Sequence, residues 1–212
     1  MGLFDFFKNK KDEMKEPVLP VIHDISFGRT VVIDPLAISL LGADHRMKLS
    51  TPSLTITGQG TVPFEDGVWL HRFYTDNHEL LQIMGGDGKH DFGVQQISLF
   101  SVYDSIEPAN EAALEAEIAK LKADTYTLDG VEYKRVWFDG DGPTEPVQFH
   151  ETVYLDEGGA ENYGIQQQCM LFGREVDGQE ESLLVTHEKT DQGDESVTLM
   201  VGAVLSPNDI SI

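Results

Sequence analysis

The sequence predicts a mainly β protein of the α+β class, folded as an antiparallel sandwich or an open barrel. Three observations predict this class. Short runs in which apolar and polar residues alternate, such as residues 131–138, recur through the chain. Turn-forming Gly and Asp residues separate these runs about every 8–12 residues, which is typical of antiparallel sheets. One long segment has the periodicity of an amphipathic helix, and β-rich sequence lies on both sides of it.

The first expected elements are a short strand and a short helix. A β-branched run precedes Asp34 and Pro35, which suit the N-cap and the first turn of a helix. We expect this helix to run to Leu41 and to be buried, because it is apolar almost all round. Residues 49–62 are expected to form a strand, a Gly turn and a second strand. Residues 68–76 and 79–86 are expected to form a hairpin, and residues 92–102 the strand after it.

The amphipathic helix is expected over residues 111–123. Leu114, Ile118 and Leu121 form one narrow apolar stripe on this helix. A stripe of this width is expected to pack against one surface of a sheet, as part of the hydrophobic core. After residue 124 the pattern returns to strands. These strands are expected at residues 131–138, 147–156, 163–176, 181–189 and 197–205.

An internal repeat relates the two sides of the helix. The sequence YGIQQQCMLF at residues 163–172 closely resembles FGVQQISLF at residues 92–100. Upstream of each copy lies a segment with the order Val-x-apolar-His followed by Tyr-x-Asp, at residues 68–76 and 147–156. The second segment has one extra residue, as a β-bulge would require.

The repeat predicts two similar β-halves, residues 50–107 and 124–205, packed about a pseudo-twofold axis with the helix between them. A ligand cleft is often found between such halves. His71 and His150 occupy equivalent positions in the two copies. They could face each other across that cleft as acid–base groups or ligands, or each could be a half-buried strand histidine with a structural hydrogen bond.

Composition and charge restrict the function. The net charge of -22 disfavours nucleic acid, since like charges repel over a Debye length of about 8–10 Å. The single cysteine, Cys169, excludes an intramolecular disulfide and indicates a reducing compartment; its apolar neighbours predict a buried side chain. No apolar run is long enough to span a membrane and no signal peptide is recognised, so a cytoplasmic protein is predicted.

The N-terminal segment predicts a docking function. Residues 1–20 are expected to be an amphipathic segment and linker, and residues 21–212 one β-rich domain. The segment places apolar side chains on one helical face and lysines directly after them, as in helices that lie on membranes or in partner grooves. The predicted docking residues are Leu3, Phe4, Phe6, Phe7, Lys8, Lys10 and Lys11.

Other motifs give weaker indications. No HExxH pattern or helical histidine pair indicates zinc, so neither a metal site nor a cofactor is expected. The acidic segment at residues 139–145 has too few oxygen ligands for a calcium loop, and a tight turn is expected there. Adjacent glutamines at residues 95–96 and 166–168 place one side chain inward in each strand, where it must be hydrogen-bonded. They could line a polar pocket or hold a loop in place, and the contact with a loop is favoured.

The segments MGLFDFF, VWLHRFYTD and YGIQQQCMLFGRE together resemble the YjfK-like family of uncharacterised bacterial proteins. The resemblance covers the chain from about Ile22 to its end. It implies no catalytic residues. The family is associated with a phage-shock-type membrane-stress protein and with membrane proteins, which implies an accessory role at the inner membrane.

Two functions follow as hypotheses. The first is a non-enzymatic cytoplasmic accessory protein, peripheral to the inner membrane, which docks onto a membrane or a membrane-bound partner through its N-terminal segment. The alternative is a small-molecule binder or enzyme with a cleft between the β-halves near His71 and His150. Cations held by acidic loops are a third hypothesis. The sequence does not predict a substrate, a particular partner or an oligomeric state.

Overall fold

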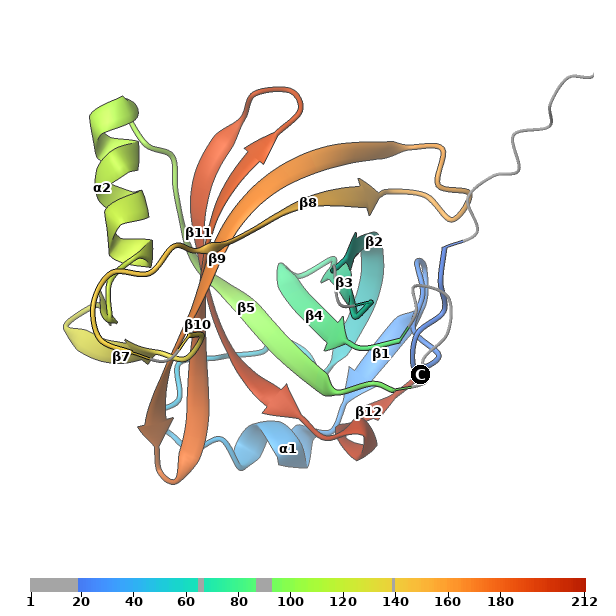
Figure 1. The fold of residues 1–212 in the computed structure, drawn as a ribbon. Helices are drawn as coiled ribbons and strands as arrows, with labels where there is room; N and C mark the ends of the chain where they lie inside the picture. The colour runs from blue at the N-terminus through green and yellow to red at the C-terminus, as the bar shows by residue number, and fades with distance from the viewer. Residues whose placement is uncertain (1–18, 65–66, 87–92, 139) are drawn as a thin grey trace, which may run out of the picture.

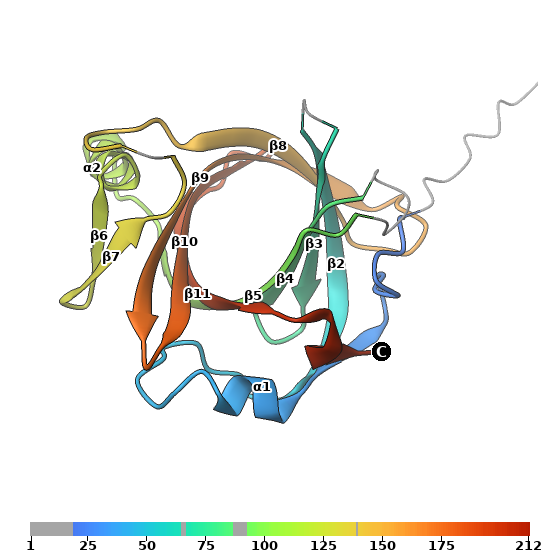
Figure 2. The ribbon, with the colours of Figure 1, turned by 60° about the horizontal axis from the view of Figure 1, so that its bottom comes forward.

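A computed structural model describes residues 19–64, 67–86, 93–138 and 140–212. In this part of the chain, eight antiparallel strands close into a barrel, which Figure 1 shows from the side and Figure 2 shows nearly end-on. In order around the barrel, they are β2 (Ser53–Pro63), β3 (Trp69–Thr75), β4 (Glu79–Met84), β5 (Gln96–Ile106), β11 (Glu195–Leu205), β10 (Gln179–Thr190), β9 (Asn162–Val176) and β8 (Val147–Tyr154).

The prediction of an open barrel or sandwich is wrong, because β8 closes the sheet. β8 pairs with β9 on one side and with β2 on the other, where Gly60 is opposite Val153. Strands β2 and β8 lie far apart in the sequence, and alternation within a strand does not reveal its partner. Closure pairs the backbone groups that an open sheet would leave at its edges.

The remaining elements lie against the outside of the barrel (Figures 1 and 2). They are β1 (Thr30–Ile33) with β12 (Ile210–Ser211), the hairpin of β6 (Thr125–Leu128) and β7 (Val131–Arg135), and the helices α1 (Pro35–Ser39), α2 (Glu111–Leu121) and η1 (Pro207–Asp209). Helix α2 confirms the predicted amphipathic helix. Asn110 caps it by accepting a hydrogen bond from the backbone N–H of Ala113, and Leu121 is buried.

Helix α1 begins as predicted but is not buried. The Asp34 side chain caps it by accepting a hydrogen bond from the backbone N–H of Leu36 at 2.8 Å. None of its residues is buried, and Leu36 is 61% exposed. The helix lies on the outside of the barrel and is five residues long, so only Ile38 reaches the hydrophobic core.

The barrel wall separates an apolar exterior from a partly polar lumen. Arg72 in β3 donates hydrogen bonds to side chains in β8 and β9, which are not neighbours of β3, so its side chain faces the lumen. The next residue, Phe73, therefore faces outward, where it joins the larger hydrophobic cluster. This cluster is completed by side chains of the covering segments, including Ile22, Ile25, Val31, Ile33, Leu121, Tyr126, Leu128 and Tyr133.

A buried carboxylate ties the covering segments to the barrel. The side chain of Glu181 on the outer face of β10 accepts hydrogen bonds from Arg174 Nε at 2.5 Å, from the Tyr133 hydroxyl at 2.5 Å and from the backbone N–H of Arg46. Burial raises the pKa of this carboxyl group, but the hydrogen bonds from Arg174 and Tyr133 outweigh burial and hold the pKa below its usual value of 4.5.

This shift predicts how Glu181 contributes to stability against acid. A carboxyl group with a lowered pKa in the folded state stabilises the protein above its unfolded-state pKa, and the contribution is lost as the pH falls through the folded-state pKa. We expect Glu181→Gln to lower the free energy of unfolding by about 1–3 kcal/mol at pH 7. The difference should shrink as the pH falls below 4.5. Urea unfolding at a series of pH values measures it. Glu132→Gln, at an exposed site in β7, is the control. A difference independent of pH would contradict the assignment.

Candidate functional site: an ionic layer and two mouths of the barrel

An arginine lies inside the barrel, about halfway along the lumen. The Arg72 side chain is 2% exposed. Its Nη1 donates to Glu151 Oε2 at 3.1 Å and to Gln167 Oε1 at 2.6 Å, and its Nε donates to Gln82 Oε1 at 3.2 Å. The guanidinium also lies over the ring of Phe149, 5.1 Å from its centroid. Four strands therefore hold one cation.

The matching carboxylate is Glu151 in β8, which is fully buried. It accepts hydrogen bonds from Arg72, from Gln167 Nε2 at 2.5 Å and from the Tyr74 hydroxyl at 2.9 Å. The neighbouring strand β2 has a glycine, Gly60, beside this carboxylate. A Cβ at this position would lie 1.7 Å from Glu151 Oε1, so only a glycine leaves room for the Glu151 side chain. We call Arg72, Gln82, Glu151 and Gln167 the ionic layer.

The pairing with Glu151 keeps the Arg72 guanidinium charged. Burial lowers the pKa of Arg72, but Glu151 outweighs it, and the pKa is raised overall. Burial and then Glu151 raise the pKa of the Tyr74 hydroxyl, so this group stays a neutral hydrogen-bond donor. Burial also raises the pKa of the Cys169 thiol, to about 11. The thiol is buried in the lumen beside Gln167, so it is a packing group with little thiolate character.

On one side of the ionic layer the barrel opens into a cavity of about 410 Å³. We call it the tyrosine mouth. Its lining includes Tyr74, His78, Leu80, Val153, Tyr163, Glu188, Thr198 and Met200. On the other side is a cavity of about 530 Å³, which we call the aromatic mouth. Its lining includes Phe64, Leu70, Arg72, Gln82, Met84, Trp137, Phe138, Val147 and Phe149. Both volumes lie within the range of small-molecule sites, about 300–1,000 Å³.

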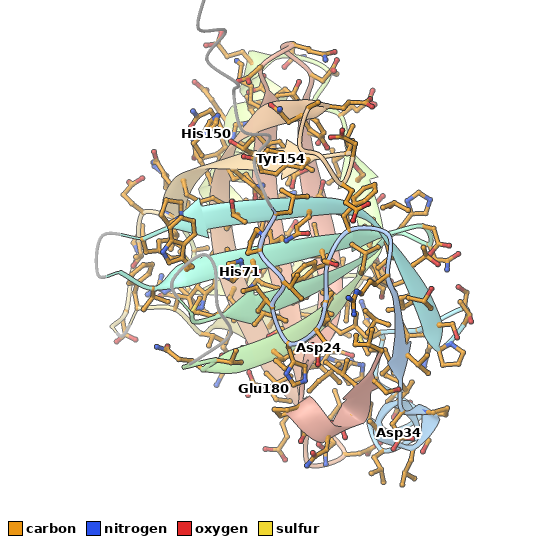
Figure 3. All side chains as sticks on the ribbon, turned by 90° about the vertical axis from the view of Figure 1, so that its right-hand side faces the viewer. Asp24, Asp34, His71, His150, Tyr154 and Glu180 are labelled. Carbon is orange, nitrogen blue, oxygen red and sulfur yellow. The ribbon has the colours of Figure 1, made fainter. Side chains whose placement is uncertain are left out.

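The two predicted cleft histidines lie on the outer face of the barrel. His71 is in β3, fully buried, and its ring stacks against Trp69 with the centroids 6.3 Å apart. His150 is in β8 and exposed. Strand β2 lies between β3 and β8, as Figure 3 also shows. Neither histidine lines the tyrosine mouth or the aromatic mouth, and a cleft shared by the two stays a prediction.

The repeat positions face different sides of the wall. Tyr74 faces the lumen, where its hydroxyl donates a hydrogen bond to Glu151. Tyr154 pairs with Gln59 of β2, which faces outward, so Tyr154 faces outward as well. The extra residue of the second copy accounts for this difference, since a shift of one residue reverses the face. β8 pairs with β9 without a register shift, so the extra residue forms no bulge in that ladder. The repeat itself stays a prediction.

The prediction of an inward, hydrogen-bonded glutamine is confirmed at one position, but its side-chain partners lie in barrel strands and not in a loop. Gln167 points inward and is hydrogen-bonded in the ionic layer, while Gln166 is exposed. The sequence reasoning missed Arg72 and Glu151. The signal was present in the alternation, because residues two positions apart share one face of a strand. The residues two positions from Arg72 are Leu70 and Tyr74. Those two positions from Glu151 are Phe149 and Val153, so each charge lies on a mainly apolar face.

The other candidates are placed as follows. The predicted docking residues at positions 3–11 lie outside the described residues. In the acidic segment after position 139, the backbone carbonyls of Gly140 and Gly142 accept hydrogen bonds from Arg135, and Glu145 pairs with Lys122 at 2.8 Å. Among the residues that the structure describes, no group of three or more His, Cys, Asp or Glu side chains is arranged to hold a metal ion.

These features define a class of protein, a closed eight-stranded antiparallel barrel with an ionic layer across its lumen and a cavity at each mouth. The chain belongs to the family described as a protein of unknown function (DUF2491), which matches residues 4–211. No curated protein and no solved structure matches the chain. The closer resemblance to YjfK-like proteins stays a prediction. None of the described helices is both long and apolar enough to cross a bilayer.

The ionic layer predicts a strong coupling between Arg72 and Glu151. Removing one partner leaves a buried charge uncompensated, so we expect Arg72→Met and Glu151→Leu each to cost about 3–5 kcal/mol of unfolding free energy. The double variant should lose less unfolding free energy than either single variant, because no unpaired charge remains in it. Urea unfolding of all four proteins measures the coupling. For comparison, the Lys120–Glu117 pair, in which Lys120 is half exposed, should give at most about 0.5 kcal/mol. Additive losses at Arg72 and Glu151 would contradict the ionic layer.

Proposed function

We propose that this protein binds a small, mainly apolar molecule in the aromatic mouth of its barrel. The observation that carries the proposal is the combination of apolar walls with a polar floor. Phe149, Trp137 and Leu70 belong to the walls, while Arg72 and Gln82 belong to the floor. Ligand sites are commonly built in this way, with a few fixed polar groups that orient an otherwise apolar molecule.

The floor indicates the chemistry of the ligand. The charge of Arg72 is already matched by Glu151 at 3.1 Å, so the floor is close to neutral. The net charge of -22 also repels anions from the protein as a whole. A neutral group that accepts hydrogen bonds, such as a carbonyl or hydroxyl, therefore fits the floor better than a carboxylate does.

The lining supports binding rather than acid–base catalysis. The described residues that line the aromatic mouth include no Asp, Glu, His or Cys. General acid–base and nucleophilic mechanisms need such groups within reach of the substrate. The alternative of an enzyme with His71 and His150 in a shared cleft gains no support from this cavity, which lies inside the barrel.

Binding at the aromatic mouth can be tested with N-phenyl-1-naphthylamine, a neutral apolar dye that fluoresces in apolar surroundings. In a Trp69→Phe background, Trp137 is the single tryptophan and reports from the wall of the mouth. We expect the dye to bind and to quench Trp137. Val147→Trp places an indole in the mouth and should weaken dye binding by about tenfold or more, equivalent to about 1.4 kcal/mol.

The matched control adds the same indole elsewhere. Leu36→Trp changes an exposed residue of α1 and should leave dye affinity unchanged. Equal affinities in the Val147→Trp and parent proteins, or dye binding without a response of Trp137, would show that the aromatic mouth is not the site.

A second function is proposed on the sequence of the N-terminal segment. Leu3, Phe6 and Phe7 share one helical face, and three lysines follow directly. This pattern favours docking onto a membrane surface or a membrane-bound partner, with the barrel held beside it. It fits the accessory role at the inner membrane that the YjfK-like resemblance implies.

Membrane docking predicts a specific loss on vesicle binding. We expect the full chain to co-sediment with phosphatidylethanolamine–phosphatidylglycerol vesicles, and the Phe6→Ser/Phe7→Ser variant to co-sediment several-fold less, because less apolar area enters the interface. Leu36→Ser/Leu40→Ser removes two exposed apolar side chains outside the segment and serves as the control. If the Phe variant and the parent sediment equally, membrane docking through this segment is excluded.

A further inference from the structure

The tyrosine mouth has a chemistry different from that of the aromatic mouth. Tyr74 and Tyr163 lie in its wall with the carboxylate of Glu188, and aliphatic side chains complete the lining. Glu188 also lines an adjoining cavity of about 560 Å³, which shares Tyr163 and Ser105 with the first. Glu188 thus lines two adjoining cavities on the side of the ionic layer away from the aromatic mouth.

Glu188 has little compensation for its charge. Its carboxylate accepts one hydrogen bond, from Thr198 Oγ1 at 3.3 Å. Arg72 attracts it but donates its own hydrogen bonds to the other members of the ionic layer. No lysine or arginine is among the described residues that line either cavity. A half-buried carboxylate is stabilised by a cation, and this one faces space where a cation could lie.

The balance of charges in the lumen also leaves the Glu188 carboxylate without a matching positive charge. Arg72 and Glu151 neutralise each other, which leaves Glu188 as an excess negative charge. Burial raises the pKa of Glu188, Arg72 lowers it, and Glu151 raises it again, so the pKa lies above its usual value. At low pH a proton neutralises this carboxylate, and at higher pH a bound cation would do the same.

The other titratable groups around Glu188 are mostly carboxylates. Glu79 and His78 belong to the lining of the tyrosine mouth, and Glu107, Asp194 and Glu195 to that of the adjoining cavity. Lys189, the next residue in β10, pairs with Glu195 at 3.7 Å. The field of the whole protein, with a net charge of -22, also attracts cations to this mouth.

We propose that the tyrosine mouth binds a small organic cation, an alkylammonium group that pairs with Glu188 and lies between the side chains of Tyr74 and Tyr163. Ammonium groups are attracted both by carboxylates and by aromatic rings. The hydrocarbon part would contact the aliphatic wall formed by Leu80, Val153 and Met200. A metal ion fits less well, since it needs several ligands and no group of three or more His, Cys, Asp or Glu side chains among the described residues is arranged to hold one. The site is separate from the aromatic mouth and does not depend on the function proposed there.

Calorimetric titration with n-butylammonium chloride at pH 8 tests this site, with n-butanol as the neutral probe of the same shape and sodium chloride as the salt control. We expect n-butylammonium to bind the parent protein and n-butanol to bind at least tenfold more weakly. Glu188→Gln, which keeps the shape of the side chain, should weaken n-butylammonium binding by about tenfold or more. Glu132→Gln removes one exposed carboxylate and should not change it.

Two further measurements separate a binding role from a folding role. Tyr163→Leu leaves Glu188 in place and should weaken n-butylammonium several-fold without affecting n-butanol. In the parent protein, affinity should rise with pH as Glu188 ionises, and this rise should be absent in Glu188→Gln. Four outcomes would each overturn the proposal. Two are equal binding of n-butylammonium to the parent and to Glu188→Gln, and equal binding of n-butanol and n-butylammonium to the parent. The other two are displacement of n-butylammonium by calcium chloride at the same concentration, and failure of n-butylammonium to bind the parent. N-phenyl-1-naphthylamine binding at the aromatic mouth should be unchanged in all these variants.

Discussion

The ion pair of Arg72 and Glu151 is the interaction on which the interior of the barrel depends. A lone charge at this depth would be strongly destabilising, and the pair is tolerated because Gln82, Gln167 and Tyr74 satisfy its remaining hydrogen-bonding capacity. The partners come from four strands, so the pair requires the closed barrel. In return, it fixes which strands face one another across the lumen and divides the lumen into two mouths.

This interior determines where the hydrophobic core must lie. The smaller apolar cluster is in the lumen and includes Phe100, Cys169 and Met200, while the larger one lies between the barrel wall and the segments that cover it. The covering elements are therefore part of the core. Helix α2, the β6–β7 hairpin and the segment before β1 bury apolar residues of the outer wall, and Glu181 ties this layer to the barrel through Tyr133 and Arg174.

Parts of this structure could be predicted because they depend on near neighbours in the chain. The cap at Asp34, the amphipathic helix α2, the hairpin of β3 and β4, and one inward glutamine in β9 all follow from local spacing. The burial of α1 could not be predicted in the same way. Its apolar residues indicate a buried helix, but Leu36 and Leu40 are exposed because the barrel turns only one side of this short helix toward the core.

The sequence by itself determined the β-rich class, the approximate positions of most strands and the acidic charge, because alternation, turn residues and composition are local or additive properties. The Gly turn expected within residues 49–62 is wrong, since its glycines lie inside the single strand β2. Only the tertiary structure decided that β2 and β8 pair, that His71 and His150 lie on the outer wall, and that Arg72, Glu151 and Glu188 share one lumen. These facts depend on which distant strands become neighbours. Strand pairing is a property of the whole sheet, and alternation within one strand is equally compatible with many partners.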